Sequence, residues 1–240
     1  EISHVYAGIA GGHIKGFNSH GIVAVKDKEV CQMDLDRVID AARAVAIPLD
    51  REVIHILPQE FVVDTQSGIK NPVDMVGRRL EAKVHLVTCA TSAAKNITKC
   101  VEEAGLGIQG FIYQPLASAE AVLEQHEKDL GVVLVDIGGG TTDICVYFEG
   151  EVRHSAVLPI GGNSISNDIA MITQISLEDA EGIKIKYGSA KAAMASTELE
   201  FELPCKADET PRDASEHEIS RYVEARMTEI FQMVKREIER

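Results

Sequence analysis

Hydrophobic residues in the first part of the chain alternate between short strand-like runs and a helical spacing. Residues 5–10 and 22–25 are apolar runs, and Gly11, Gly12, Asn18 and Gly21 between them predict turns that join two strands. Between Asp34, a residue suited to helix capping, and Pro48, apolar residues recur every three or four positions, which predicts one helix.

Further apolar runs lie at residues 53–57 and 61–63, and Pro58 between them predicts a break. Strands and helices then alternate, an order typical of an α/β fold. The expected elements are a loop around Gly68 and Pro72, a strand at residues 83–89, a helix at 92–104 that ends at Gly105, a strand at 111–113 and a helix at 116–123.

Three β segments follow one another in the middle of the chain. Residues 132–137 are a continuous apolar run, as expected of a strand buried on both faces. Residues 144–148 and 152–158 follow across tight turns, and Gly161 and Gly162 then precede a helical pattern. The pattern therefore predicts three successive strands and then a helix.

The last part of the chain is expected to be mainly helical. One helix is predicted at residues 180–187, and the polar, acidic segment at 197–215 is expected to be a loop. A final helix carries its apolar residues on one stripe, which is typical of core packing. These residues are Ile219, Tyr222, Val223, Met227, Ile230, Phe231, Val234 and Ile238.

The segment that is most informative about chemistry is Asp-Ile-Gly-Gly-Gly-Thr-Thr-Asp, residues 136–143. Its three glycines, Gly138, Gly139 and Gly140, carry no Cβ, so their backbone N–H groups can approach a phosphate directly. The residues on either side add donors and acceptors. They are Thr141 and Thr142, whose hydroxyls can donate to the phosphate, and Asp136 and Asp143, whose carboxylates can hold Mg²⁺ directly or through its waters.

Other glycine-rich motifs fit this segment less well. In a dinucleotide-binding turn the glycines lead from a strand into a helix, whereas here they lead into a second strand. A Walker A loop requires Gly-Lys-Ser/Thr, and no lysine follows these glycines. A plain hairpin turn is the simplest alternative, but it does not require two acids and two threonines around it.

The charge of the chain argues against a nucleic-acid partner. Among 240 residues, 38 are acidic and 24 are Lys or Arg, which gives a formal net charge of −14. A chain this acidic is repelled by phosphate backbones. The apolar runs are also far shorter than the about 20 residues that cross a bilayer, and no secretory leader opens the sequence.

The cysteines and histidines suggest no metal or disulfide framework. The five cysteines form no Cys-x-x-Cys pair, and the eight histidines are dispersed, so a reducing, cytoplasmic compartment fits. His55 and His85 lie in apolar runs, and we expect both to be hydrogen-bonded core or interface residues. Ser118 and Ser155 lie in no nucleophile-elbow context.

The segment 136–143 resembles the second phosphate-binding hairpin of the actin, Hsp70 and sugar-kinase superfamily. Gly161 and Gly162 resemble the glycine pair that approaches the nucleotide there, and Glu181 and Lys184 resemble the Glu and Lys that contact the nucleoside. Their i,i+3 spacing puts both side chains on one helix face. Without the other motifs, an exposed helical ion pair would be the simpler interpretation.

A longer resemblance, to the FtsA family of bacterial cell-division proteins, covers nearly the whole chain. The segments that carry it are residues 41–48, 54–61, 68–72, 80–89, 116–118, 154–162 and 180–188. It implies a partial actin-like (ribonuclease H-like) α/β fold with an FtsA-type inserted α/β subdomain. The implied division is the inserted subdomain at 1–82, the rest of the first lobe at 83–130, the core of the second lobe at 131–175 and a peripheral subdomain at 176–240.

The resemblance also implies a function. It implies an ATP-binding adaptor with weak or no ATPase activity. Such a protein self-associates and tethers FtsZ polymers to the inner face of the cytoplasmic membrane at the division site. ATP and Mg²⁺ would be the cofactors. Arg226 would contact the FtsZ tail, and residues 1–82 would contact other division proteins.

Three parts of the family pattern are missing from the sequence: the first phosphate hairpin, the adenosine motif expected after Arg240 and a C-terminal amphipathic helix that targets the membrane. The chain is therefore expected to be truncated at both ends and to hold about half of an ATP site. Two alternatives stay open: an actin-like scaffold of pilus assembly or cell shape, and an Hsp70-type or sugar-kinase-type ATPase. Residues 1–82 count against the ATPases, which would not carry this insertion.

Overall fold

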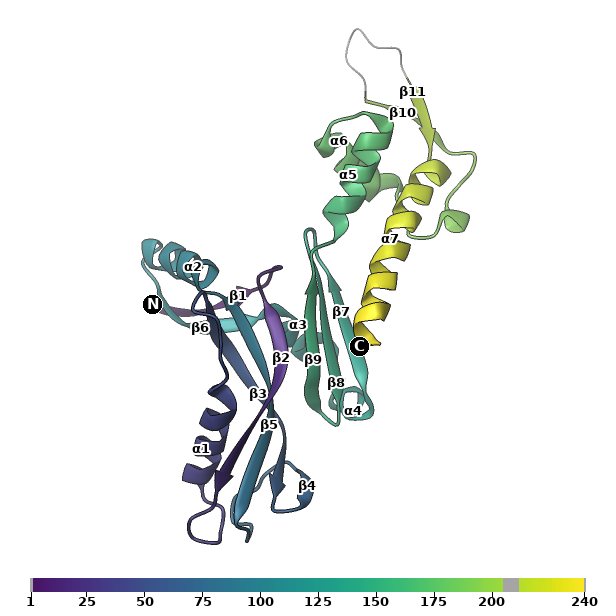
Figure 1. Ribbon diagram of the computed structural model, residues 1–240. Helices are drawn as coiled ribbons and strands as arrows, with labels where there is room; N and C mark the ends of the chain where they lie inside the picture. The colour runs from purple at the N-terminus through teal and green to yellow at the C-terminus, as the bar shows by residue number, and fades with distance from the viewer. Residues whose placement is uncertain (1, 205–211, 240) are drawn as a thin grey trace. The chain divides into compact units, whose positions relative to one another are not determined.

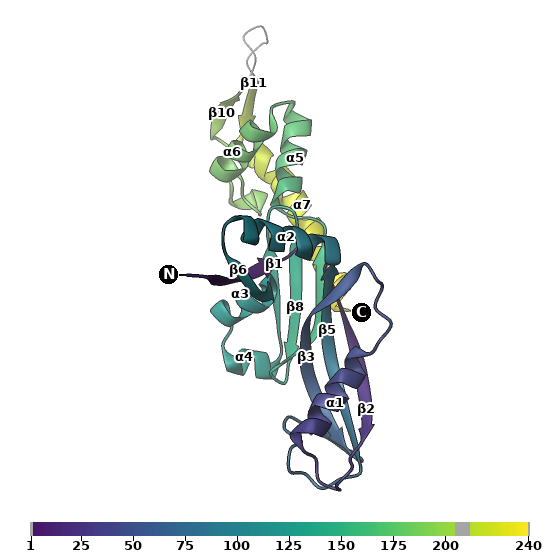
Figure 2. The same ribbon diagram turned by 90° about the vertical axis from the view of Figure 1, so that its left-hand side faces the viewer.

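The computed structural model describes residues 2–204 and 212–239, which group into two units. The first unit comprises Glu1–Asp136 and Asp143–Val157, and the second comprises Ile137–Thr142 and Leu158–Arg240. Figure 1 labels their helices and strands, and Figure 2 shows the same elements from a second direction.

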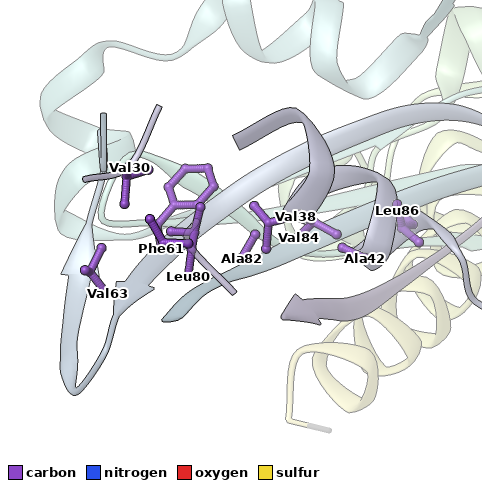
Figure 3. Packing of buried hydrophobic residues seen from close by; sticks show 10 residues of the cluster. Val30, Val38, Ala42, Phe61, Val63, Leu80, Ala82, Val84 and Leu86 are labelled. Carbon is purple, nitrogen blue, oxygen red and sulfur yellow. The ribbon is translucent and has the colours of Figure 1, made fainter. Parts of the chain in front are cut away.

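A four-stranded antiparallel sheet forms the first part of the first unit, with the strand order β2-β5-β3-β4. Its strands are β2 (Lys15–Ala24), β3 (Arg51–Val63), β4 (Gln66–Ile69) and β5 (Arg79–Ala90). Helix α1 (Gln32–Arg43) lies along one face of this sheet (Figures 1 and 2). Figure 3 shows Val38 and Ala42 of α1 next to Val84 and Leu86 of β5 in the buried core between them. We call this sheet together with α1 the insert.

Two residues that the sequence assigned to turns, Asn18 and Gly21, lie inside β2. The predicted strand at residues 22–25 is only the end of β2, which begins at Lys15 and contains Gly16 and Gly21. A Cβ on Gly21 would overlap the α1 backbone at Val38 and Ala42. The turn prediction was wrong because this glycine serves a close approach of helix and strand.

Strand β3 runs through Pro58, contrary to the predicted break. The pairing of β3 with β5 shifts between Pro58 and Glu60, so Gln59 is the extra residue of a β-bulge. Proline is tolerated at a bulge because it has no N–H group to contribute to the sheet.

Helix α1 also differs in detail from its prediction. Its N-cap is Cys31, and Asp34 is the third helical residue, where its carboxylate accepts a hydrogen bond from the Cys31 backbone N–H at 3.4 Å. The helix ends at Arg43, before Pro48.

Five further elements of the first unit follow the predicted alternation of strands and helices. They are β1 (His4–Ile9), α2 (Thr91–Glu103), β6 (Gly107–Tyr113), α3 (Gln114–Val122) and a short helix that was not predicted, α4 (Gln125–Leu130). Strands β1 and β6 pair in parallel. Gly105 follows α2 with a φ of +78°, in agreement with its predicted role at the helix end.

The three β segments in the middle of the chain form a three-stranded sheet with the order β7-β8-β9. The strands are β7 (Val132–Ile137), β8 (Thr142–Phe148) and β9 (Glu151–Leu158), which confirms the three predicted strands. Strand β7 is half-buried along its length and lies at the edge of this sheet, so the expectation that it is buried on both faces was wrong. The predicted boundary between residues 82 and 83 lies inside β5, so an insert that keeps its strands whole would extend to Ala90. The four-part division of the chain stays a prediction.

The second unit is mainly helical, as predicted. Its helices are α5 (Gly162–Thr173), α6 (Leu177–Tyr187), the 3₁₀ helix η1 (Ala192–Met194) and α7 (Glu216–Ile238). Ile169 of α5, Ala180 of α6 and Ile219 of α7 are fully buried in one shared core. Ile230 and Val234 of the α7 stripe are also buried, whereas Phe231 and Ile238 are 52% and 43% exposed.

A hairpin occupies much of the segment that was predicted to be a loop. Strands β10 (Glu200–Leu203) and β11 (Arg212–Ser215) pair in antiparallel fashion. The Phe201 ring stacks on Tyr187 of α6 with 3.8 Å between centroids, so this polar segment still has an apolar side. The remaining residues of the predicted loop, 205–211, lie outside the described residues. In the described part of the chain, no helix combines the length and apolarity that a membrane span requires.

Candidate functional site

The glycine segment forms a tight turn between β7 and β8, as the sequence predicts. The Gly138 N–H donates to the Thr141 carbonyl at 2.8 Å, which closes the turn. Gly138, Gly139 and Gly140 are exposed, and none of them is helical. The strand–turn–strand arrangement excludes the dinucleotide-binding and Walker A alternatives, because both require a helix directly after the glycines.

The carbonyl groups of the turn are held by the first turn of α5. The Gly162 N–H donates to the Gly138 carbonyl at 2.9 Å, and the Asn163 N–H donates to the Gly139 carbonyl at 2.8 Å. These two N–H groups belong to the helix N-terminus, where no carbonyl of the helix itself can accept from them. The turn and the helix therefore satisfy each other's backbone groups.

This arrangement fixes the direction of two further N–H groups. In a trans peptide, the carbonyl of one residue and the N–H of the next point in opposite directions. Because the Gly138 and Gly139 carbonyls point at α5, the N–H groups of Gly139 and Gly140 point away from it. Within the described ranges, no hydrogen bond occupies either of these N–H groups. The turn thus presents two adjacent donors on its exposed side.

Gly161 is required for the approach of α5 to the turn. A Cβ on Gly161 would lie 2.5 Å from the Gly138 carbonyl oxygen and 2.7 Å from that of Gly139. Its φ of −168° is accessible to any residue, so the constraint is one of space and not of backbone conformation. Gly161 is buried, and with Gly162 it positions the turn.

The two threonines have different surroundings. Thr142 is fully buried, and its hydroxyl donates to the Ile160 carbonyl at 2.8 Å, which ties β8 to the segment before α5. Thr141 is half-buried at the end of the turn. The Thr142 side chain therefore supports the turn from within, whereas Thr141 lies next to the exposed donors.

Asp136 and Asp143 flank the turn on β7 and β8. One oxygen of Asp136 accepts a hydrogen bond from the Ser118 hydroxyl at 2.9 Å. Asp143 is buried, and the pKa of the neighbouring Tyr113 is raised well above its usual range by burial and then by the Asp143 carboxylate. Continuing the antiparallel pairing from the closed turn sets Asp136 opposite Asp143, and opposite residues share one face of a hairpin.

Two carboxylates fit the coordination habits of Mg²⁺. This ion is usually bound through one or two carboxylates, with phosphate oxygens and waters as the other ligands. Among the residues that the structure describes, no group of three or more His, Cys, Asp and Glu side chains is placed to hold a metal ion. A cation at Asp136 and Asp143 would therefore need ligands from phosphate and water.

The predicted pair on α6 is joined to the first turn of α5. Lys184 Nζ donates to Glu181 at 2.6 Å, to the Ser166 hydroxyl at 2.9 Å and to the Gly162 carbonyl at 3.2 Å. Ser166 also donates to Glu181. Hydrogen bonds from Lys184 and then Ser166 lower the pKa of Glu181. The pair is more than an exposed helical ion pair, because it anchors α6 to the residue that holds the turn.

Arg226 forms a two-pronged ion pair within the second unit. Its Nε and Nη2 donate to the two carboxylate oxygens of Asp168 on α5, both at 2.7 Å, and its Nη1 donates to Glu229. Hydrogen bonding to Asp168 is the main reason why the pKa of Arg226 is raised. The side chain thus connects α7 to α5, whether or not it also contacts a partner.

Two family models match this chain. One, described as the SHS2 domain inserted in FtsA, matches residues 11–88, and the other, described as cell division protein FtsA, matches residues 133–239. The chain belongs to the FtsA family. The first match covers β2, β3, β4 and nearly all of β5, so the insert of this FtsA-family chain is the family's SHS2 domain.

Curated members of the FtsA family match the chain from end to end. It is 49% identical over 240 residues to cell division protein FtsA of Pseudomonas aeruginosa and 44% identical over 240 residues to that of Neisseria meningitidis serogroup B. It is 41% identical over 238 residues to that of Escherichia coli K12. These matches cover 99–100% of this chain but 57–58% of the relatives, so the chain spans little more than half their length.

Solved structures confirm the predicted actin-like fold. The PilM–PilN type IV pilus biogenesis complex matches with a TM-score of 0.64 and 16% identity, over 99% of this chain and 58% of that chain. MreB 5 of Spiroplasma citri bound to AMPPNP matches with a TM-score of 0.50 and 23% identity, over 62% of this chain and 46% of that chain. At these identities the likeness concerns the fold alone.

Sequence reasoning missed three residues that organise the site. Asn163 and Ser166 lie on the first turns of α5, and Ser118 lies on α3. Ser166 follows Gly162 at the i+4 position, so helical spacing could have placed both on one face. No comparable signal in the sequence connects Ser118 to Asp136, because they meet only through the tertiary fold.

Proposed function

We propose that the chain carries the phosphate-binding part of an ATP site. The observation that carries this proposal is the pair of N–H groups of Gly139 and Gly140, which point away from α5 on an exposed turn. Successive backbone N–H groups of this kind form a concave anion site that suits phosphate. Thr141 follows them directly and is expected to add a contact to the same phosphate.

Glu181 and Lys184 are proposed to contact the nucleoside. Their support is the contact of Lys184 with Gly162, whose N–H group holds the turn. A nucleoside that touched Lys184 would therefore lie within reach of the residues that position the phosphate donors. Gly161, Gly162 and Thr142 act in this proposal by holding the turn in place.

Asp136 and Asp143 are the proposed residues for Mg²⁺. When bound, the ion would neutralise the charge of the phosphate oxygens. Asp136 uses one oxygen to accept from Ser118, which orients the carboxylate and leaves its second oxygen for a water of the cation. Water-mediated contact suits Mg²⁺, because the ion gives up its waters reluctantly.

The test compares two substitutions of Gly140 in a protein of family length. A Cβ on Gly140 meets no atom within 4 Å, so Gly140→Ala should keep the turn and the N–H group. Gly140→Pro removes the N–H and should lower the affinity for ATP–Mg²⁺ about 10- to 100-fold, the value of one charge-assisted hydrogen bond. Equal affinities in two variants of matched thermal stability would contradict the proposal.

The family further supports a role as a division adaptor. We propose that the complete protein works at the inner face of the cytoplasmic membrane, where it self-associates and tethers FtsZ polymers. Residues 1–82 are the proposed contact for other division proteins, and a C-terminal amphipathic helix is the proposed membrane anchor. The relatives named above are cell division proteins, which favours this function over a pilus or cell-shape scaffold.

Phosphate release separates an adaptor from an Hsp70-type or sugar-kinase-type ATPase. We expect turnover well below about 1 s⁻¹, the lower end of the usual enzyme range. Faster turnover would favour the enzyme.

An FtsZ tail peptide tests the contact proposed for Arg226. Arg226 already holds Asp168 and Glu229, so a tail carboxylate would have to share or displace these partners. Arg226→Ala should weaken capture of the peptide, whereas Arg221→Ala, on an exposed position of the same helix, should not. Equal capture by both variants would remove Arg226 from the proposal.

A further inference from the structure

A cluster of polar side chains, three of them buried, joins the insert to β9. We call it the polar seam; it consists of Asn18 from β2, Gln59 from β3, His85 from β5 and Ser155 from β9. Gln59, His85 and Ser155 are buried, with His85 0% exposed, whereas Asn18 lies at the exposed end of the cluster. All four residues belong to the first unit.

The hydrogen bonds of the seam have a defined direction. His85 Nδ1 lies 2.6 Å from the Asn18 side-chain oxygen, and His85 Nε2 lies 2.7 Å from the Ser155 hydroxyl. The Asn18 oxygen can only accept, so Nδ1 carries the proton of the neutral ring and Nε2 accepts from Ser155. The Asn18 amide is held in this orientation because its nitrogen donates to the Arg153 carbonyl at 3.1 Å.

Gln59 adds a second connection between the insert and β9. Its amide nitrogen donates to the Val152 carbonyl at 2.8 Å and to the Asn18 side-chain oxygen at 3.2 Å. The bulge that begins at Pro58 allows this contact, because a bulged residue is free to leave the alternation of the strand. β9 is an edge of its own sheet, and side-chain amides of the insert occupy carbonyls at the start of this strand.

The close approach of the two sheets also depends on Gly16 of β2. A Cβ on Gly16 would lie 2.6 Å from His85 Nε2 and would also overlap Ser155. This explains the second glycine inside β2.

A hydrolase function does not explain the seam. Serine, histidine and asparagine in this order resemble a nucleophile, its base and an orienting residue. Yet the serine and the histidine are buried, so no substrate carbonyl can reach the hydroxyl. The seam therefore acts through the structures that it joins.

We propose that the polar seam couples β9 to the insert, so that a displacement of β9 caused by a ligand at the glycine turn passes to β2, β3 and β5. The displacement of β9 by a ligand rests on the proposed nucleotide function. Strand β9 ends at Leu158, and the chain continues from there to Gly161, which packs on the turn.

The chemistry of the seam favours coupling over independent motion. Apolar surfaces can slide past each other with little change in energy, whereas hydrogen bonds weaken steeply with distance and angle. A shift of β9 against the insert would leave buried donors and acceptors without partners. Strand β9 and the insert are therefore expected to move together.

Hydrogen–deuterium exchange of the ligand-free protein of family length tests the coupling itself. Ser155→Ala should raise exchange in both β9 and β5 by about tenfold, because it leaves the buried His85 Nε2 without a donor. Ser19→Ala is the matched control, because the Ser19 hydroxyl donates to the Ala42 carbonyl within the insert at 2.8 Å. It should leave exchange in β9 unchanged.

A second variant guards against misfolding of the first. Gln59→Leu removes the hydrogen bonds that Gln59 donates to the Val152 and Arg153 carbonyls of β9 and leaves the His85–Ser155 hydrogen bond intact. It should also raise exchange in β9 and the insert together. If Ser155→Ala and Gln59→Leu change β9 alone, or if Ser19→Ala has the same effect on β9, the seam does not couple the two.

Addition of ATP–Mg²⁺ tests transmission. In the unaltered protein the ligand should change exchange in the insert severalfold, and in Ser155→Ala this response should disappear while ATP affinity stays within about threefold. If ATP binds and the insert does not respond, the inference fails and the proposed function stands. If ATP does not bind, the proposed function fails, and the ligand-free comparison alone decides whether the seam couples β9 to the insert.

Discussion

The glycine turn and the polar seam use polar groups in opposite ways. The turn exposes two backbone N–H groups on one side, and on the other side its carbonyls pack on α5 so closely that Gly161 has no room for a side chain. The seam buries three of its four side chains and gives each a partner, as His85 illustrates. A site that binds a ligand must leave donors unused, whereas a connection between two sheets must use them. The turn should therefore be sensitive to added volume, and the seam to the loss of a partner.

The largest expected effect comes from adding volume at the turn. Gly161→Ala forces its Cβ against the Gly138 and Gly139 carbonyls, so it should displace α5 from the turn. We expect ATP affinity to fall by more than about 100-fold and the free energy of unfolding to fall by about 1–3 kcal/mol. Nucleotide titration and urea unfolding measure the two effects.

The control for Gly161→Ala is Gly182→Ala. A Cβ on Gly182 in α6 meets no atom within 4 Å, and alanine favours helix by about 0.5–1 kcal/mol over glycine. Stability should rise slightly and affinity should stay the same. Equal losses in the two variants would contradict the packing explanation of Gly161.

The next effect concerns the seam and its pH dependence. Burial, and then the neighbouring His154, lower the pKa of His85 to about 4 from its usual 6.5. Between about pH 4 and pH 6.5, His85 therefore binds a proton more readily in the unfolded chain than in the folded protein. The seam's contribution to stability is complete above about pH 6.5 and is lost as the pH falls toward 4, by at most roughly 1.4 kcal/mol per pH unit.

Urea unfolding between pH 7.5 and 4.5 measures this dependence, with His85→Gln as the comparison. Glutamine keeps hydrogen-bonding groups but does not titrate. The His85→Gln variant should therefore be less stable at neutral pH and should show a shallower decline on acidification. An identical slope in both proteins would mean that His85 is not the titrating group.

A smaller effect is expected at the support of the turn. Lys184→Met removes the links to Gly162, Ser166 and Glu181, and it should lower ATP affinity about tenfold and stability by about 1 kcal/mol. Lys186→Met is the control on the same helix, because Lys186 contacts the Tyr187 ring instead. If the control loses as much ATP affinity, the effect reflects general charge and not the site.

The smallest effect should come from Arg226→Lys. Lysine keeps the charge but cannot bond both oxygens of Asp168 in a fork, so the α5–α7 link weakens. We expect a loss of about 0.5–1 kcal/mol in urea unfolding. Arg221→Lys should change nothing measurable, and a loss at Arg221 of the same size would show that the fork to Asp168 contributes no stability.

The contrast between the two regions also explains what the sequence could predict. The turn was predictable because consecutive glycines between two apolar runs leave a local pattern, and β7 has the predicted bounds. Gly21 and Pro58 were misassigned because each is determined by a tertiary contact: the approach of α1 and the bulge of β3. Sequence patterns therefore predict a turn well only where neighbouring residues determine it, and less well where a contact with a distant element does.

The site shows the same limit. Thr142 was grouped with Thr141 as a phosphate donor, but its hydroxyl meets the Ile160 carbonyl, which no spacing rule indicates. The seam could not be predicted from the sequence for the same reason. Asn18 and Ser155 come from distant parts of the chain and meet only in the fold. His85 was correctly expected to be a hydrogen-bonded core or interface histidine, but its partners were not predicted.

The most direct test of the account is to observe the backbone donors themselves. In a full-length family protein that carries these 240 residues, glycine-selective ¹⁵N labelling reports each amide during titration with ATP–Mg²⁺. We predict large shifts of the Gly139 and Gly140 amide signals and small shifts at Gly162, whose N–H is already bonded to Gly138. If ATP binds while the Gly139 and Gly140 signals stay in place, the phosphate is not held by this turn.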